Sequence, residues 1–237
     1  MTTKLLVPTD FSEVAHSAIQ HSVKFASIID AEVILLHIVN SRDEISSAKD
    51  KLEVEVSLGK AFSPSCNIIS TVRVGNIFDD IGDVAAELGI SLIFMGTHGA
   101  SRWQQIIGSR ALKVITSSPV PFILVQEKLM NDTGYDHIVV PLDLNFETKQ
   151  KLELVAKISH YFDSQVHLIT KDEDDEVIKN KLKANQLWAI NYLKEKNVIV
   201  CGSTQGIGEA TAIELAKLGA NITLIARNEN KLSEVLN

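Results

Sequence analysis

The chain has 237 residues, of which 45% are hydrophobic and 22% charged, and its net charge is −7; such a composition is typical of a globular protein with one large or two modest domains. It has no basic stripe and no run of about 18 apolar residues, so neither nucleic-acid binding nor a membrane span is expected. The N-terminus lacks a signal-peptide pattern, and Cys66 and Cys201 form no metal-ligand spacing, so we expect a reduced, cytoplasmic protein without a metal site.

Strand and helix patterns alternate through the first half of the chain. Continuous apolar runs such as residues 33–36 favour strands of a parallel sheet that is covered on both faces. Their alternation with helices predicts a doubly wound α/β domain. The strands are predicted at residues 4–8, 32–39, 68–74, 91–96 and 121–126, and the helices at 12–29, 43–62, 78–88 and 108–117.

The same pattern begins again further along the chain. The tripeptide PTD at residues 8–10 ends the first predicted strand, and PLD at 141–143 ends another one 133 positions later (143 minus 10). Residues 30–35 and 163–168 match at the same offset. We therefore predict a duplicated α/β unit. The second copy has predicted strands at 137–141 and 165–169 and predicted helices at 146–161 and 175–195.

The second copy breaks off after residue 196. A turn-rich segment at 131–134 precedes it, and the acidic run at 171–176 is interpreted as a solvated loop that favours the start of its last helix. Beyond residue 196 nothing resembles residues 75–126 of the first copy. The predicted domains are a complete one at 1–130, a partial one at 136–196 and a separate fragment at 197–237.

Glycines follow the fourth predicted strand of the first copy. Ligands of an open parallel sheet bind beyond the carboxyl ends of the strands, where the strand order reverses. Asp10 follows the first strand at that edge, and Gly96 and Gly99 let the backbone after the fourth strand approach a ligand closely. Gly108 and Ser109 open the next helix, whose free N–H groups, positive dipole end and hydroxyl suit a phosphate.

Three motifs together resemble the universal stress protein family: PTDFSE at 8–13, LHI at 36–38, and Gly-x-x-Gly followed by Gly-Ser between 96 and 109. The resemblance covers residues 1–127 fully and about 137–196 as an incomplete tandem domain. It implies a 3-2-1-4-5 sheet of the adenine-nucleotide alpha-hydrolase-like type. It also implies ATP, with or without Mg, as the ligand, and a role in stress survival through binding rather than turnover.

The resemblance further implies which residues hold the nucleotide. Thr9, Asp10 and Ile38 would lie at the adenine and nearby ribose, and the remaining residues would line the ribose and phosphates: Met95, Gly96, His98, Gly99, Gly108, Ser109 and Arg110. Gly99 and Gly108 enclose eight residues, whereas the family pattern has nine. This deletion would shift the phosphate loop, so a nucleotide-free signalling or scaffold domain stays an alternative.

No catalytic site is predicted in either copy. A paired-carboxylate site would need a partner base or metal ligands that the sequence does not offer. His37, inside an apolar strand, is interpreted as a hydrogen-bonded core residue, and His16 and His21 as surface residues of an amphipathic helix. Asp143 keeps the position of Asp10, but no glycine loop follows it, so a second ATP site is not expected.

The end of the chain carries a different glycine pattern, G-x3-G-x-G, formed by Gly202, Gly206 and Gly208. A strand (197–202), helix (206–218), strand (221–226) and short helix (229–236) are predicted in order. Residues 197–237 look like the first βαβ unit of a short-chain dehydrogenase/reductase, and that resemblance implies that Arg227 would favour NADP over NAD. The family's downstream serine and Tyr-x-x-x-Lys pair do not occur before Asn237. We therefore interpret the motif as vestigial, with NADP bound weakly or not at all.

Two expectations concern assembly. The strand at 121–125 has no counterpart in the second copy, so its apolar edge is expected to pair in a homodimer. The residues from 197 on, called the tail below, are expected to dock onto the second sheet. In one arrangement, the two strands of the tail would replace the missing strands, one on each side of the two strands of the second copy. In the other, both strands of the tail would add to one edge of that sheet.

The predicted function is stress-response binding of ATP or a related adenine nucleotide by the first domain, without turnover. The alternative is a nucleotide-free dimeric scaffold, and the remote alternative is a catalytically incomplete NADP-binding reductase fragment.

Overall fold

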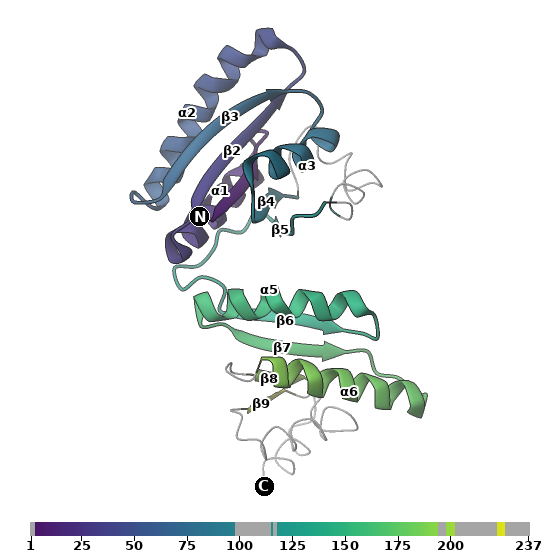
Figure 1. Ribbon diagram of the computed structural model, residues 1–237. Coiled ribbons are helices and arrows are strands. Elements are labelled where there is room, and N and C mark those ends of the chain that lie inside the picture. The colour runs from purple at the N-terminus through teal and green to yellow at the C-terminus, as the bar shows by residue number, and fades with distance from the viewer. Residues whose placement is uncertain (1–2, 98–114, 116–117, 194–197, 202–221, 226–237) are drawn as a thin grey trace. The chain divides into compact units, whose positions relative to one another are not determined.

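The computed structural model describes residues 3–97, 115, 118–193, 198–201 and 222–225. The chain divides into two compact units, unit 1 (Met1–Asp132) and unit 2 (Thr133–Asn237) (Figure 1). Unit 1 holds a five-stranded sheet of order β3-β2-β1-β4-β5, and unit 2 a four-stranded sheet of order β6-β7-β8-β9. All their strand pairs are parallel, which confirms the predicted fold class and the 3-2-1-4-5 order. The assignment of residues 197–237 to a third, separate domain stays a prediction.

The elements of unit 1 follow the predicted ranges to within two residues. They are β1 (Lys4–Pro8), α1 (Glu13–Ile29), β2 (Glu32–Val39), a short 3-10 turn (Arg42–Glu44), α2 (Ile45–Phe62), β3 (Asn67–Val74), α3 (Ile77–Leu88), β4 (Leu92–Gly96) and β5 (Phe122–Val125). The predicted helix at 108–117 falls almost wholly outside the described residues.

Helices cover both faces of the first sheet. On one face α2 approaches α1 and β3 closely at Gly59, where a Cβ would lie 2.7 Å from the Ile68 side chain and 3.5 Å from those of Ile19 and Val23. On the other face α3 packs on alternate residues of the central strands. That buried cluster consists of Leu6, Ile34, Leu36, Ile81, Val84, Ala85, Ile90, Ile93 and Met95. Because both faces are apolar, the central strands read as continuous hydrophobic runs in the sequence.

Residues 127–132, the return segment, run back along α1 after β5. The Ser17 hydroxyl donates to the carbonyl of Glu127 (3.0 Å), and the buried Gln20 amide exchanges two hydrogen bonds with the backbone of Met130. His21 Nε2 donates to the carbonyl of Lys128 at 3.0 Å. His21 was predicted as a surface residue; it is half-buried, because the return segment partly covers it.

We expect the partial burial of His21 to make unit 1 sensitive to acid. Burial lowers the pKa of this imidazole below its ordinary value of 6.5. The unfolded chain therefore binds the proton more readily than the folded one, and stability falls as pH drops through and below 6.5. We expect the His21→Gln variant to lose less stability than the wild type between about pH 7 and 5. Urea unfolding followed by the amide signals of α1 measures this; parallel pH curves for the two proteins would contradict it.

Unit 2 repeats the first four elements of unit 1. Its elements are β6 (His137–Leu142), α5 (Phe146–Phe162), β7 (Gln165–Thr170), α6 (Glu176–Tyr192), β8 (Val198–Cys201) and β9 (Ile222–Ile225). The bounds of α1 and α5 differ by 133 at both ends (146 minus 13 and 162 minus 29). Both helices end in a left-handed aspartate, Asp30 with φ 54° and Asp163 with φ 50°. The helices predicted at 206–218 and 229–236 lie outside the described residues.

The tail contributes both of its strands to one edge of the second sheet. β8 pairs with β7 in the register Val166↔Val198, and β9 pairs with β8 in the register Val198↔Ile222. Docking of the tail is confirmed, in the one-edge arrangement. β8 lies beside β7 as β3 lies beside β2. This is the side that the general preference for right-handed crossovers favours.

The described helices of unit 2 therefore share one face of its sheet. Val140 and Leu168 point into a cluster that includes Leu152 of α5 and Ile190 of α6. Residues that alternate with these along the strands are exposed; the exposed fraction of Val139, for example, is 58%. None of the helices that the structure describes is long and apolar enough to cross a membrane.

Candidate functional site

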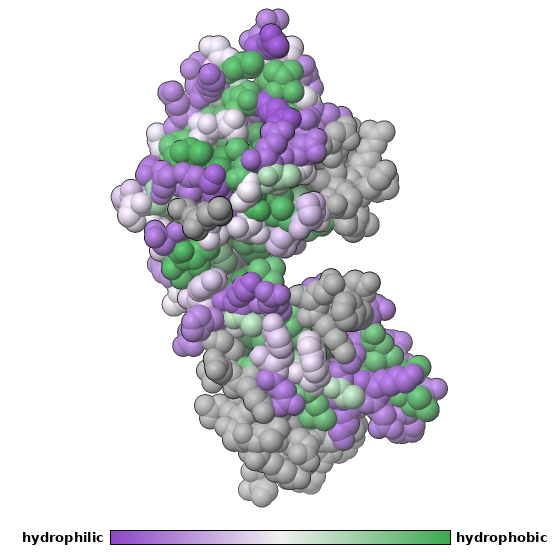
Figure 2. Space-filling model, in the orientation of Figure 1, coloured by the Kyte–Doolittle hydropathy of each residue, from purple (hydrophilic) through white to green (hydrophobic). Residues whose placement is uncertain are grey.

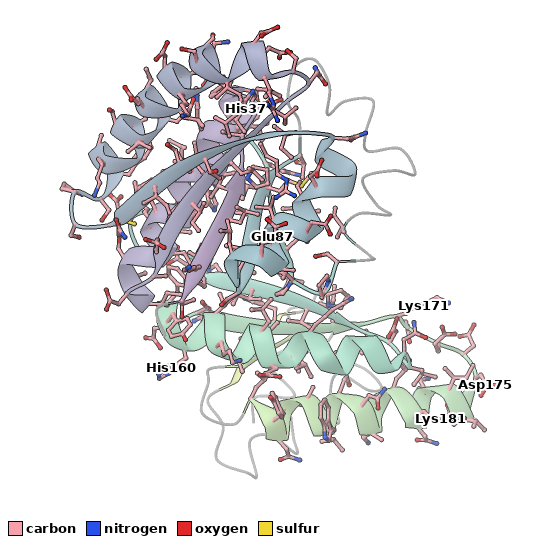
Figure 3. All side chains as sticks on the ribbon, turned by 45° about the horizontal axis from the view of Figure 1, so that its top comes forward. His37, Glu87, His160, Lys171, Asp175 and Lys181 are labelled. Carbon is pink, nitrogen blue, oxygen red and sulfur yellow. The ribbon has the colours of Figure 1, made fainter. Side chains whose placement is uncertain are left out.

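The end of β1 is tied to β2 through Thr9. This residue is buried, its N–H donates to the carbonyl of Leu36 at 2.9 Å, and its own carbonyl accepts from His37 Nδ1 at 2.7 Å. His37 lies near the carboxyl end of β2 (Figure 3). The contact confirms that His37 is hydrogen-bonded, but the residue is half-buried rather than part of the core as predicted. These two hydrogen bonds tie the carboxyl end of β1 to that of β2.

Asp10 organises the turn between β1 and α1. Its Oδ1 accepts hydrogen bonds from the backbone N–H of Ser12 (3.1 Å) and from the Ser12 hydroxyl (2.5 Å). The Ser12 oxygen in turn accepts from the N–H of Ala15 and caps α1, an arrangement that stabilises a helix by about 1 kcal/mol. Within the described part of the chain only Oδ1 of this carboxylate is engaged, so Oδ2 remains available to a ligand.

Phe11 holds a strained backbone between these two residues. Its φ of 66° is left-handed, which for a residue with a large side chain costs about 1–2 kcal/mol. Its N–H donates to Thr9 Oγ1 (3.0 Å), its ring lies 4.3 Å from that of His37, and the Lys51 ammonium stands 5.4 Å from its centre. Strain of this kind persists where surrounding contacts enforce it, and it concentrates at ligand sites.

The end of β4 completes this edge of the sheet. Ile38 and Met95 pack in the same apolar cluster, so the carboxyl ends of β2 and β4 share that face. A Cβ on Gly96 would lie 2.8 Å from the carbonyl oxygen of Val14, so the start of α1 can approach β4 only at a glycine. Thr97 follows, with its N–H donating to the carbonyl of Val125 at 2.9 Å.

The structure thus brings together five of the residues predicted to bind nucleotide: Thr9, Asp10, Ile38, Met95 and Gly96. The other five lie outside the described residues: His98, Gly99, Gly108, Ser109 and Arg110. The glycines of the tail and Arg227 also lie outside them: Gly202, Gly206, Gly208 and Arg227.

The equivalent turn of unit 2 differs in two ways. Asp143 Oδ1 accepts from the N–H of Asn145 (2.9 Å), and Oδ2 accepts from the Asn145 side-chain amide (2.8 Å). Both carboxylate oxygens are therefore engaged, unlike those of Asp10. Leu144, which corresponds to Phe11, is not among the described non-glycine residues with positive φ. The second turn has neither the available oxygen nor the strain of the first.

Sequence reasoning missed a contact between His16 of α1 and the buried Glu55 of α2. His16 Nε2 lies 2.7 Å from Glu55 Oε1, and the Glu55 side chain is only 5% exposed. Burial raises the pKa of Glu55, and the His16 contact opposes that shift. His16 was predicted as a surface residue because only its own helix was considered. The spacing of Ala48, Leu52, Glu55 and Gly59, all buried, is the signal that could have located Glu55 on the inner stripe of α2.

Other charged groups have local structural roles. Arg73 of β3 binds Glu87 of α3 through both terminal nitrogens, and this contact lowers the pKa of Glu87 (Figure 3). Asp175 caps α6 by accepting from the N–H groups of Val177 and Ile178, which agrees with the interpretation of the acidic run. Among the described residues, no group of three or more His, Cys, Asp or Glu could hold a metal ion.

Comparison with known proteins matches two separate segments of the chain. Residues 1–126 match the universal stress protein family. A universal stress protein of Methanocaldococcus jannaschii is 27% identical over 158 residues, which cover 54% of this chain and 97% of that protein. A solved universal stress protein of Archaeoglobus fulgidus is similar over 99% of this chain and 89% of that one, with a TM-score of 0.60 and 19% identity, a likeness of fold.

Residues 196–237 match a second family, the short chain dehydrogenases. An uncharacterized oxidoreductase of Staphylococcus epidermidis is 49% identical over 43 residues. The matched segment is 18% of this chain and spans only about a fifth of that protein, at 19% of its length. The similarity therefore concerns a fragment of a dehydrogenase fold, which confirms the resemblance stated for residues 197–237.

Proposed function

We propose, on the premise that this chain belongs to the universal stress protein family, that unit 1 binds ATP or a related adenine nucleotide and acts in a stress response through binding without turnover. The proposed site lies at the carboxyl ends of β1, β2 and β4, where an open parallel sheet binds its ligands. The nucleotide would bind with or without a Mg ion at its phosphates.

The turn at residues 9–12 carries this proposal. It holds the Asp10 carboxylate by one oxygen and leaves the other available, with Phe11 in a strained conformation beside it. A carboxylate is an acceptor for the exocyclic amine of adenine or a ribose hydroxyl. The partly buried Ile38, which packs against the cluster that contains Met95, supplies apolar surface for a base at the same edge. The resemblance implies that His98, Gly99, Gly108, Ser109 and Arg110 hold the phosphates; these five residues lie outside the described part of the chain.

A nucleotide-free dimeric scaffold is the second candidate, and β5 favours it. β5 lies at the edge of the first sheet and exposes 48% of Leu124. An apolar edge strand of this kind pairs readily with another strand. We propose that residues 121–125 pair with the same strand of a second copy, an assembly compatible with nucleotide binding at the carboxyl ends of the strands.

Matched variants at the two equivalent turns test the binding site. Asp10→Ala should lower ATP affinity about tenfold or more, because a hydrogen bond to a charged group contributes roughly 1.5–3 kcal/mol. Asp143→Ala removes the same turn interaction from unit 2 and should leave ATP affinity unchanged. Equilibrium dialysis with labelled ATP measures both affinities. Equal affinity of the Asp10→Ala variant and the wild type would refute the assignment.

A further inference from the structure

A pocket of about 360 Å³ opens between α1, α2 and the return segment, apart from the proposed nucleotide site. Its α1 side includes Glu13 and His16, its α2 side Glu55, Leu58 and Phe62, and the return segment closes it with Leu129. This volume is at the lower end of the range for small-molecule sites. Apolar patches lie among polar residues on the surface of unit 1 (Figure 2).

The polar end of the pocket contains an incompletely paired carboxylate. Glu55 Oε1 is bonded to His16, but no donor among the described residues reaches Glu55 Oε2, although that oxygen is buried. A buried carboxylate oxygen without a donor is unfavourable by roughly 1–3 kcal/mol. A group with N–H donors that reached it would remove this deficit.

The charge around the pocket favours a cation. Three glutamates, Glu13, Glu55 and Glu127, are among its lining residues, and His16 is the one cationic candidate among them. The side chain of Glu13 is 95% exposed at the opening. A phosphate or carboxylate ligand would be repelled, whereas an ammonium would be attracted.

The apolar walls of the pocket favour a ligand that carries a hydrocarbon chain next to its cationic group. Leu58, Phe62 and Leu129 are 41%, 40% and 50% exposed, so each presents apolar surface that a ligand could remove from water. We propose that this pocket binds small organic ammonium ions, with the ammonium at Glu55 and the hydrocarbon chain against Leu58, Phe62 and Leu129. This site is independent of nucleotide binding.

The test uses n-hexylammonium as the probe, with 1-hexanol and hexanoate as neutral and anionic probes of equal chain length. Hexylammonium should bind saturably at concentrations on the order of 10 mM or below and shift the amide signals of Glu13, His16 and Ser17. Hexanoate should not bind. Hexanol binding as tight as that of hexylammonium, or no saturable shift at these amides, would overturn the proposal.

Two matched pairs of variants locate the site. Glu55→Gln should weaken hexylammonium binding about tenfold, whereas Glu53→Gln, an exposed position on the same helix, should not change it. Leu58→Lys should abolish binding and Val54→Lys should not; both residues are exposed on α2, so neither variant threatens folding. Unchanged binding in both Glu55→Gln and Leu58→Lys would refute the site.

Discussion

Replacing Gly96 by valine should destabilise unit 1 by roughly 1–3 kcal/mol and weaken nucleotide binding with it. A Cβ at this position would lie 2.8 Å from the carbonyl oxygen and 2.9 Å from the carbonyl carbon of Val14. These are backbone atoms in the first turn of α1, so a side-chain rotation cannot relieve the contact. The start of α1 must move away from β4, and Asp10 and Ser12 precede that helix directly. Urea unfolding followed by the amide signals of unit 1 measures the loss.

Gly82→Ala is the matched control for this variant. Gly82 lies within α3, and a Cβ there would meet nothing within 4 Å. Alanine in a helix interior is more favourable than glycine by roughly 0.5–1 kcal/mol, so this variant should be as stable as the wild type or more so. If the Gly96→Val and wild-type proteins unfolded at the same urea concentration, the close approach of α1 to β4 would not exist.

Replacing Ile199 by proline should unfold much of unit 2 while leaving unit 1 intact. β8 has a neighbour on each side, so each of its N–H groups belongs to one of the two ladders. Proline removes one such bond, worth about 1 kcal/mol, and leaves an acceptor without its donor at roughly 1–3 kcal/mol more. Amide hydrogen exchange should show loss of protection across β6 and β7 and unchanged protection in β1 and β2.

Ile199→Val keeps both the N–H group and a branched side chain, so its exchange pattern should match that of the wild type. Unchanged protection of β6 and β7 in the Ile199→Pro variant would mean that these strands are stable without the tail. The second sheet would then not depend on residues that resemble a dehydrogenase.

Strand positions and the duplication could be predicted from the sequence because they depend on local patterns. Continuous apolar runs located β1, β2 and β4, and the shared offset of residues 10 and 143 located β6 and α5. The arrangement of the tail could be narrowed to two alternatives but not decided. Both alternatives satisfy the right-handed crossover rule, and the choice depends on which edge of β6 and β7 offers the better pairing.

Those parts of the site in which the residue type determines the role could be predicted from the sequence. The parts that depend on how the elements pack could not. Asp10 and Gly96 could be placed by the resemblance and by the positions of strand ends. The left-handed backbone of Phe11 could not, because no local rule assigns that conformation to phenylalanine. The pairing of His16 with Glu55 was missed for a similar reason. It depends on how α2 packs against α1 across 39 residues of chain (55 minus 16).

Calorimetric titration of the full chain with ATP and NADPH, side by side, tests the central claim most directly. The claim is that the binding chemistry resides in unit 1, at the turn that begins with Thr9 and Asp10, and not in the glycine motif of the tail. ATP should give a saturable heat of binding to a single site, and NADPH should bind weakly or not at all. Absence of ATP binding at concentrations on the order of 1 mM, or tighter binding of NADPH than of ATP, would contradict it.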